Sequence, residues 1–277
     1  MKKNKVLPAL IMIAAIISLV SSIVTSGSTA FCGSSRSLSR PLLMLWAWEL
    51  PHRIDFIDDS KGEIGVAYLA QTLVLTGAEW RRTPRLQPLV VPDGTYLEAV
   101  GRIEVDRRRG ADYSEAQLDG LVRCIVETAD RPGVLSVEID FDCVRSKRGF
   151  YKTLVKRIRS SLPSKTELTI TCLASWVVGD YWLADLREDV DQVVPMFFRM
   201  GTGRRAVLSH VGGGRSLACS DYSNESVAFG FSVDEVDVIE RFKSGIPKQF
   251  TGDRRVYLFS PGLWNKRSLS KVKEEIL

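Results

Sequence analysis

The sequence has few of the residues that hold metals or haem. Its 277 residues include two histidines, His52 and His210, and five cysteines, none of which forms a C-x-x-C pair. Zinc and haem sites usually need closely spaced ligands of these types, so we expect no metal site and no cofactor. We expect buried thiols instead. Cys143 and Cys172 are the candidate disulfide pair, because they would lie on neighbouring strands.

A strong excess of charge and the usual nucleotide-binding loops are also missing. The formal net charge is +5, and Arg107–Arg109 is the densest basic cluster. No basic helix is interleaved with aromatic residues, so we expect no nucleic acid partner. The glycine-rich stretches GTGRR from Gly201 and GGG from Gly212 match neither a P-loop nor a dinucleotide fingerprint, and we interpret both as flexible loops.

The N-terminus has the order of a targeting segment. Three lysines within the first five residues precede an uncharged apolar stretch from Val6 to about Val24, and the small residues SGSTA follow. This order predicts that residues 1–36 are a secretory signal or an uncleaved membrane anchor. Lipid attachment at Cys32 is a third alternative. Each alternative predicts an exported protein, periplasmic or extracellular, that meets the membrane only through this segment.

Residues 37–277 show no long linker, and we expect them to form one domain. Eight strand-like runs recur along it: Leu42–Trp48, Glu63–Ala70, Tyr96–Val105, Val134–Phe141, Leu168–Ala174, Gln192–Phe198, Val227–Phe231 and Arg255–Ser260. Helical patterns with a 3.6-residue period fall between several of them. One begins at Ser114, where Gln117 completes a capping box, and another stops at Pro163. Ser232 and Glu235 predict a second capping box, and a last helix is expected near the C-terminus.

Strands that alternate with helices favour a parallel sheet. Eight strands in this length predict an α/β fold, a (β/α)₈ TIM-type barrel. We expect it to be distorted, because residues 71–93 indicate an irregular excursion or small hairpin, and residues 202–226 are not clearly helical. An open doubly wound sheet is the alternative.

The fourth predicted strand is unusual. Its stretch SVEIDFDCV alternates the apolar residues Val137, Ile139 and Phe141 with the acids Glu138, Asp140 and Asp142. In a barrel the apolar side would face the helices, and the acids would enter the lumen near the carboxyl end of the strand, where active sites of this fold lie. Burial and like charge raise carboxyl pKa values, which suits general acid catalysis.

The preceding strand places charges on the same side. Arg102 and Glu104 share one parity in YLEAVGRIEVD, so both are expected to face the lumen beside the acids. Arg102 would be a counter-ion for them. The alternative is a buried ion network that only stabilises the barrel.

Tryptophans follow the ends of three predicted strands. Trp46 and Trp48 end the first, Trp176 follows the fifth and Trp264 follows the eighth. Indole rings stack on the apolar faces of sugars, although core packing is the alternative for each. The predicted substrate-binding residues combine these tryptophans with polar residues of the lumen, strand ends and loops. They are Trp48, Glu49, Gln71, Arg102, Glu104, Trp176, Asp180, Arg199 and Trp264.

Two family resemblances follow from these residues. The acids at 138, 140 and 142 resemble the signature of chitinase-like family-eighteen glycoside hydrolases, which implies that Asp142 protonates the leaving group. Here Asp142 is one methylene shorter than the family's glutamate. Much of the chain also resembles the bacterial domain of unknown function 3142, in WAWE, GVAYLAQTL, PRLQPL, IDFD, LTITCLASW, GDYWLADL, VPMFFRMG and VYLFSP. That resemblance implies an exported barrel related to glycoside hydrolases.

The sequence thus predicts an exported barrel that binds a polysaccharide or oligosaccharide and hydrolyses it. Asp142 would be the general acid, Asp140 would set its pKa, and Glu138 would lie deeper. A non-catalytic glycan-binding or envelope scaffold protein is the alternative. A third hypothesis is a calcium or magnesium ion held by the acids.

Overall fold

The computed structural model describes residues 40–60, 62–180, 182–219, 223, 226–245 and 254–276. The expected signal or anchor at residues 1–36, with Cys32, lies outside the described residues. No helix in the described ranges is long and apolar enough to cross a membrane.

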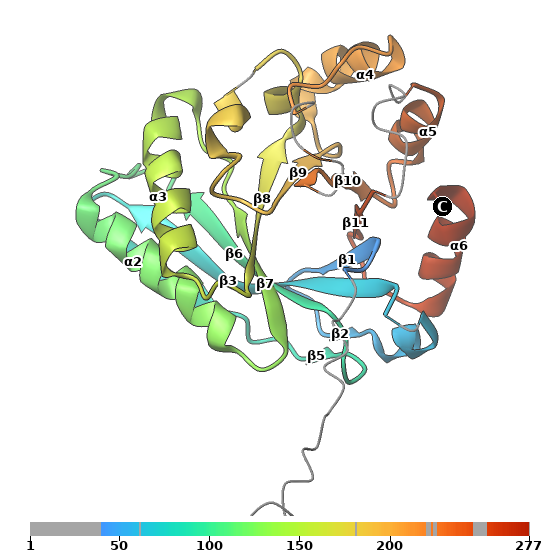
Figure 1. Ribbon diagram of the computed structural model, residues 1–277, viewed down its shortest axis with the longest axis horizontal. Coiled ribbons are helices and arrows are strands. Elements are labelled where there is room, and N and C mark those ends of the chain that lie inside the picture. The colour runs from blue at the N-terminus through green and yellow to red at the C-terminus, as the bar shows by residue number, and fades with distance from the viewer. Residues whose placement is uncertain are drawn as a thin grey trace, which may run out of the picture. The chain divides into compact units, whose positions relative to one another are not determined.

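Eight parallel strands form a closed barrel, which confirms the predicted fold (Figure 1). In barrel order the strands are β1 (Leu43–Ala47), β3 (Ile64–Thr76), β6 (Leu97–Val105), β7 (Val134–Asp140), β8 (Glu167–Leu173), β9 (Gln192–Met196), β10 (Phe229–Ser232) and β11 (Val256–Phe259). Strand β1 pairs with both β3 and β11, and these two pairings close the sheet. All eight were predicted, because each is a short apolar or alternating run.

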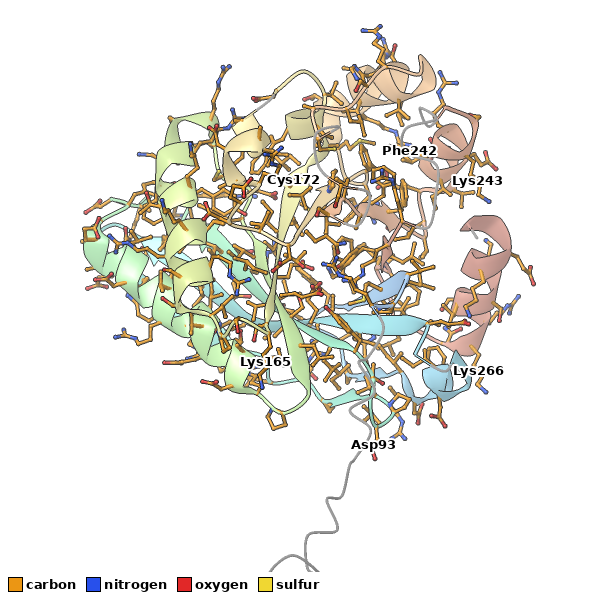
Figure 2. The ribbon with its side chains drawn as sticks, viewed as in Figure 1. Asp93, Lys165, Cys172, Phe242, Lys243 and Lys266 are labelled. Carbon is orange, nitrogen blue, oxygen red and sulfur yellow. The ribbon has the colours of Figure 1, made fainter. Side chains whose placement is uncertain are left out.

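Two apolar cores follow from the period of two along the strands. Val137 and Ile139 belong to the large core between the strands and the helices, whereas Met44, Trp46 and Tyr257 belong to a smaller one in the lumen. Side chains fill both layers (Figure 2). The apolar side of β7 therefore faces the helices, as predicted, and its acids face the lumen.

The helices follow the later strands. They are α2 (Glu115–Val126), α3 (Arg148–Ser161), α4 (Arg204–Gly212), α5 (Val236–Gly245) and α6 (Lys266–Ile276). The capping box at the start of α2 is present, with Ser114 and Gln117 each bonded to the other's backbone N–H. Helix α3 ends before Pro163, with Leu162 in the extended conformation that a following proline favours.

The barrel is distorted where the sequence indicated. In the described residues, the link from β1 to β3 contains β2 (His52–Arg53) and the 3₁₀ helix η1 (Asp55–Ser60), and no α-helix. The next link contains β4 (Glu79–Pro84), which pairs antiparallel with β3, and β5 (Leu89–Val90), which pairs with β2. The predicted hairpin within residues 71–93 is therefore confirmed.

Short 3₁₀ helices occupy several strand ends. They are η2 (Glu127–Asp130), η3 (Arg145–Lys147), η4 (Ala174–Val177), η5 (Trp182–Leu186) and η6 (Gly201–Gly203). The link from β8 to β9 contains only η4 and η5 among its described residues.

A bulge in β3 changes which residues face the helices. The register between β3 and β6 shifts between Leu69 and Gln71. Gln71, which was predicted to contact substrate, is fully buried, and its side-chain amide donates to the backbone oxygen of Cys124 in α2 at 2.7 Å. That prediction treated the strand as ending at Ala70, but β3 continues to Thr76.

Three local predictions are wrong. The stretch GTGRR is not a loop: it forms η6 and the first residues of α4, so the link from 202 to 226 is partly helical. Ser232 does not cap α5, because its hydroxyl donates to Asp234, and the Glu235 carboxylate accepts from Arg199 and Arg204. Cys143 and Cys172 form no disulfide; both are free, buried thiols.

Gly120 offers a test of how the hairpin packs on the barrel. A Cβ at Gly120 in α2 would lie 2.3 Å from the Trp80 ring of β4. Alanine normally stabilises a helix relative to glycine by about 1 kcal/mol. Gly120→Ala should instead lower the free energy of unfolding by about 1–3 kcal/mol, because the indole must move. Gly149→Ala, in α3 with open space around its Cβ, is the matched control. Urea unfolding in which Gly120→Ala is as stable as wild type would contradict this packing.

Candidate functional site

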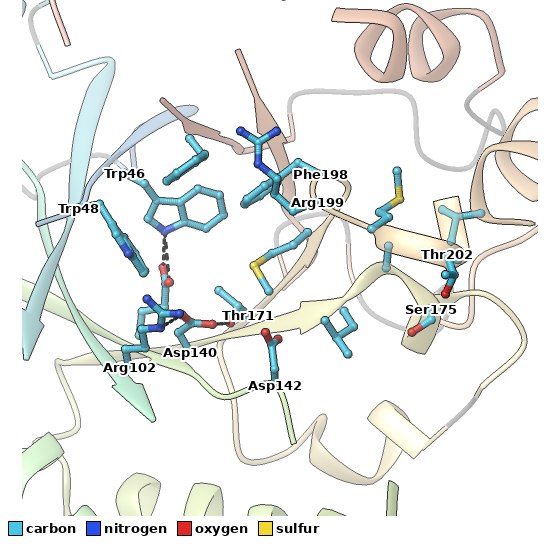
Figure 3. Close-up of a pocket in the computed structure, with 18 residues that line it drawn as sticks. Trp46, Trp48, Arg102, Asp140, Asp142, Thr171, Ser175, Phe198, Arg199 and Thr202 are labelled. Carbon is cyan, nitrogen blue, oxygen red and sulfur yellow. Dashed lines mark hydrogen bonds and ion pairs between the residues drawn. The ribbon is translucent and has the colours of Figure 1, made fainter. Parts of the chain in front are cut away.

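A cavity of about 590 Å³ opens at the carboxyl end of the barrel strands (Figure 3). Its lining comes from the ends of β1, β6, β7, β8, β9 and β11 and from the residues directly after them. Arg102, Glu138, Asp140, Asp142 and Thr171 form a polar wall. The opposite wall is mainly apolar, with Trp46, Trp48, Met196, Phe198 and Phe259.

Glu138 is the deepest of the three acids. It is fully buried, and both carboxyl oxygens accept from the indole Nε1 of Trp46 at 3.2 Å. Burial raises the pKa of Glu138 well above its ordinary value, and the carboxyl groups of Glu98 and Asp140 raise it further. Unfavourable desolvation and nearby negative charge both favour the neutral form. Both effects therefore favour the protonated form of Glu138.

Glu98, on β6, is a second buried acid in the lumen. It is fully buried, and its Oε2 accepts from the hydroxyls of Ser136 at 2.6 Å and Thr169 at 2.8 Å. Glu98 is not among the predicted site residues, although it shares the parity of Arg102 on the same strand. Two neighbouring buried carboxyl groups cannot both be ionised at low cost, so Glu98 helps to keep Glu138 neutral.

Asp140 lies between Glu138 and Asp142 and also has a raised pKa. Its carboxylate accepts from the Thr171 hydroxyl at 2.9 Å and lies 3.8 Å from Nε of Arg102. Burial and the charge of Asp142 raise the pKa of Asp140 to about 6, although Thr171 and Arg102 lower it. A carboxyl group with such a pKa can hold or release a proton near physiological pH.

Asp142 differs from the other acids because it is exposed at the cavity. No described side chain donates a hydrogen bond to its carboxylate. Partial burial raises the pKa of Asp142, and the charge of Arg102 lowers it. In Figure 3 its carboxyl group points into the cavity near Asp140. The protein thus leaves one carboxyl group free to meet a ligand.

Arg102 links the polar wall to the aromatic wall. Its guanidinium lies 2.9 Å from Glu104, and its Cζ lies 5.6 Å from the centre of the Trp48 ring. The predicted lumen orientation of Arg102 and Glu104 agrees with this placement, and Glu104 lines a neighbouring cavity. The guanidinium is therefore fixed by three interactions, including the longer ion pair with Asp140.

The aromatic wall is built from three strands that are distant in sequence. Phe198 and Phe259 stack with centroids 5.3 Å apart, and Trp46 lies 5.8 Å from Phe198. Trp48 meets the edge of Phe259 at 6.4 Å. Trp48 is among the predicted site residues, but the two phenylalanines are not. Their only signal was their position at the ends of the predicted strands.

Several predicted site residues do not line this cavity. Trp176 is buried and packs against Trp182 at 4.8 Å, and Trp264 is buried with its Nε1 donating to the Trp46 backbone oxygen at 2.9 Å. Asp180 accepts from Arg148, also outside the cavity. Glu49 is exposed beyond the end of β1. Together with Gln71, these residues do not line the cavity.

Arg199 does line the cavity, in a left-handed conformation with φ of 52°. Its guanidinium is bound to Asp234 at 2.7 Å and to Glu235 at 2.9 Å. Among the described residues, no group of three or more His, Cys, Asp or Glu side chains is arranged to hold a metal ion.

Comparisons with known proteins give structural similarity only. No protein-family model and no curated protein matches the chain, so the resemblance to domain of unknown function 3142 stays a prediction. The chain is similar to the spore cortex-lytic enzyme SleL of Bacillus cereus, at 15 % identity and a TM-score of 0.45 over 70 % of this chain and 52 % of that one. It therefore spans about half the length of SleL.

Two further solved structures are similar over more of their own length. One is the chitinase RmChi1 of Rhizomucor miehei, with 12 % identity, a TM-score of 0.44 and 69 % of each chain covered. The other is the GH113 beta-mannanase AaManA of Alicyclobacillus acidocaldarius, with 11 % identity, a TM-score of 0.47, and 82 % of this chain and 88 % of that one covered. Such similarities do not assign an activity to this chain.

The raised pKa of Asp140 predicts a pH-dependent stability. The folded protein binds the proton more tightly than the unfolded chain, so stability is greatest below the ordinary value of 3.8 and falls as pH rises to about 6. Asp140→Asn cannot titrate. The stability of wild type relative to Asp140→Asn should therefore drop by about 2 kcal/mol between pH 4 and pH 7, because the unfolded aspartate is already partly ionised at pH 4. Urea unfolding at both pH values measures it.

The control for this experiment is Asp58→Asn, which alters an exposed aspartate. Its stability relative to wild type should change much less over the same pH range. A difference between wild type and Asp140→Asn that stays constant with pH would show that the folded Asp140 titrates as it does in the unfolded chain.

Proposed function

We propose that the cavity binds a glycan and that the protein hydrolyses it, with Asp142 as the general acid. The observation that carries this proposal is the pairing of Asp140, whose pKa is about 6, with the unbonded Asp142 beside an aromatic wall. Sugars combine hydroxyls that bind carboxylates with apolar faces that pack on aromatic rings. A cavity with one polar and one aromatic wall suits both features.

The proton would move between the two aspartates as ligand binds. In the empty cavity Asp140 holds the proton below about pH 6, because burial and then the charge of Asp142 raise the pKa of Asp140 to about 6. A sugar over Asp142 would exclude water from it and raise its pKa further. The proton then favours Asp142, which gives it to the glycosidic oxygen as the bond from that oxygen to the sugar carbon breaks. Water, or a group of the substrate that water later displaces, forms the new bond to the carbon, and the proton released by the water restores the aspartate pair. Thr171 and Arg102 remain to stabilise the ionised Asp140, which stabilises positive charge at the reacting carbon.

Location and family belong to the same proposal. We expect residues 1–36 to direct the chain out of the cytoplasm or to anchor it, so that the barrel meets glycans there. The spacing of Glu138, Asp140 and Asp142 and the motifs shared with domain of unknown function 3142 support a place among exported glycoside-hydrolase-like barrels.

One observation favours a second candidate function, a glycan-binding protein without catalysis. The three carboxylates that line the cavity all come from β7 and the residues directly after it. Among the described residues none faces Asp142 from the other wall. Two-carboxylate hydrolases hold their carboxyl groups on both sides of the scissile bond, about 5–5.5 Å or about 6.5–9.5 Å apart. Catalysis here would need a nucleophile from the substrate itself or from water.

Asp142→Asn separates the two functions. We expect the full-length variant to lose about 100-fold or more of its hydrolytic rate on cell-wall or storage polysaccharides, because the amide cannot donate the proton. Binding should be kept. Product release and binding are measured together, and Asp185→Asn, an exposed change outside the cavity, is the control. Binding without hydrolysis in both proteins would favour the scaffold. Absence of binding in both would overturn the proposal.

Trp48 provides a test of the aromatic wall. Trp48→Ala should weaken glycan binding about tenfold, which corresponds to about 1.4 kcal/mol, because a stacking surface and a contact of Arg102 are lost. Trp48→Phe keeps an aromatic face and should bind with intermediate affinity. Titration calorimetry gives the order, and equal affinities for wild type and Trp48→Ala would exclude stacking at this position.

A further inference from the structure

A second cavity of about 560 Å³ adjoins the first. The two share Arg102, Asp140 and Asp142, so the carboxylates lie where the cavities meet. The second cavity is bounded by the outer half of β6 and the loop after it, by the end of β7 and the residues following it, and by Val74 of β3 and Arg81 of β4. A glycan chain that crosses the carboxylates would therefore place sugar units in both cavities.

The second cavity differs from the first in the charged groups that it offers. Three arginines line it: Arg81, Arg102 and Arg107. Arg102 is already held by Glu104 and Asp140. Arg107 is exposed and has no salt bridge or hydrogen bond from its side chain to a described residue. Arg81 is also exposed, and its positive charge helps to lower the pKa of Asp106. Two guanidinium groups thus remain accessible to a ligand.

The loop that carries Arg107 is held in place by its own hydrogen bonds. Asp106 Oδ1 accepts from the backbone N–H groups of Arg108 at 2.8 Å and Arg109 at 3.1 Å, which lowers the pKa of Asp106. Gly110 closes the turn with φ of 67° and bonds back to Asp106. The Asp106 charge is therefore engaged within the loop. A fixed loop loses less entropy when its arginine binds a ligand.

We propose that this cavity is a subsite for an anionic group of the glycan, a carboxylate or a phosphate, which Arg107 and Arg81 bind. The proposal rests on the proposed function and specifies its substrate class as acidic glycans. The guanidinium fork binds both kinds of anion through paired hydrogen bonds. The arginines also offset repulsion from Asp140 and Asp142, which would otherwise disfavour an anionic ligand beside them.

The test compares acidic glycans with neutral counterparts of the same backbone, using the full-length protein. One arm uses uronic acid polysaccharides and their carboxyl-reduced forms, and the other uses phosphate-bearing glycans and their dephosphorylated forms. Wild type should bind the acidic member of at least one pair about tenfold more tightly. The arm that shows this preference identifies the anion.

The matched variants are Arg107→Ala and Arg108→Ala, because Arg108 is exposed on the same loop but does not line the cavity. Arg107→Ala should lose most of the preference for the acidic glycan, and Arg108→Ala should keep it. Arg107→Lys should keep part of it, because the charge remains without the fork. Thermal unfolding checks that each variant is folded.

Three outcomes would overturn this inference: equal affinity for the acidic and neutral members of every pair, a preference for the neutral member, or equal losses in Arg107→Ala and Arg108→Ala. Equal losses in the two variants would indicate that the positive charge of the whole loop attracts the anion, rather than a specific subsite. In each case the proposed function still stands if a neutral glycan is hydrolysed and Asp142→Asn abolishes that hydrolysis. Failure to bind any glycan would overturn both proposals.

Discussion

The burial of acids inside a closed barrel is the constraint on which the site depends. Transfer of a carboxylate from water into the lumen costs roughly several kcal/mol, unless hydrogen-bond donors or protonation of the carboxylate offset the loss of hydration. The neighbouring strands supply those donors: Ser136 and Thr169 for Glu98, Trp46 for Glu138, and Thr171 for Asp140. Arg102 contacts only the outer part of the series. Hydrogen bonds therefore stabilise the deep acids, and Arg102 lies near the outer acids at the mouth.

The pKa values of the acids on β7 follow from this arrangement. Burial and the neighbouring Glu98 raise the pKa of Glu138 well above its ordinary value, whereas the pKa of Asp140 is raised to about 6. Burial and the charge of Asp142 thus set the raised pKa of Asp140. Because the two aspartates interact, a ligand that changes the solvation of Asp142 would change the pKa of both.

The parts of the structure that could be predicted are those determined by periodicity. Alternation along β7 and β6 placed the acids and Arg102 in the lumen, because a period of two has only one consistent orientation in a barrel. Residues beyond strand ends carry no such signal, so Trp176 and Trp264 were assigned to the cavity but pack outside it. The bulge next to Gln71 reverses which side of β3 the following residues face, and no residue pattern in the sequence indicates it. Ser232 and Glu235 have the sequence pattern of a capping box, but the Glu235 carboxylate instead forms ion pairs with Arg199 and Arg204.

The unbonded state of Asp142 separates a functional site from a structural ion network. In a network that served only stability, each carboxylate would be expected to have a donor, as Glu98, Glu138 and Asp140 do. Asp142 has none among the described residues, although it follows the same strand and faces the same cavity. The aspartate side chain is one methylene shorter than glutamate, but this does not weaken the argument. The carboxylate is available to a ligand because no described donor binds it, whatever the length of the side chain. Under the proposed function, this exposed carboxyl group between the aromatic wall and the second cavity would meet a ligand that presents both an apolar face and polar groups.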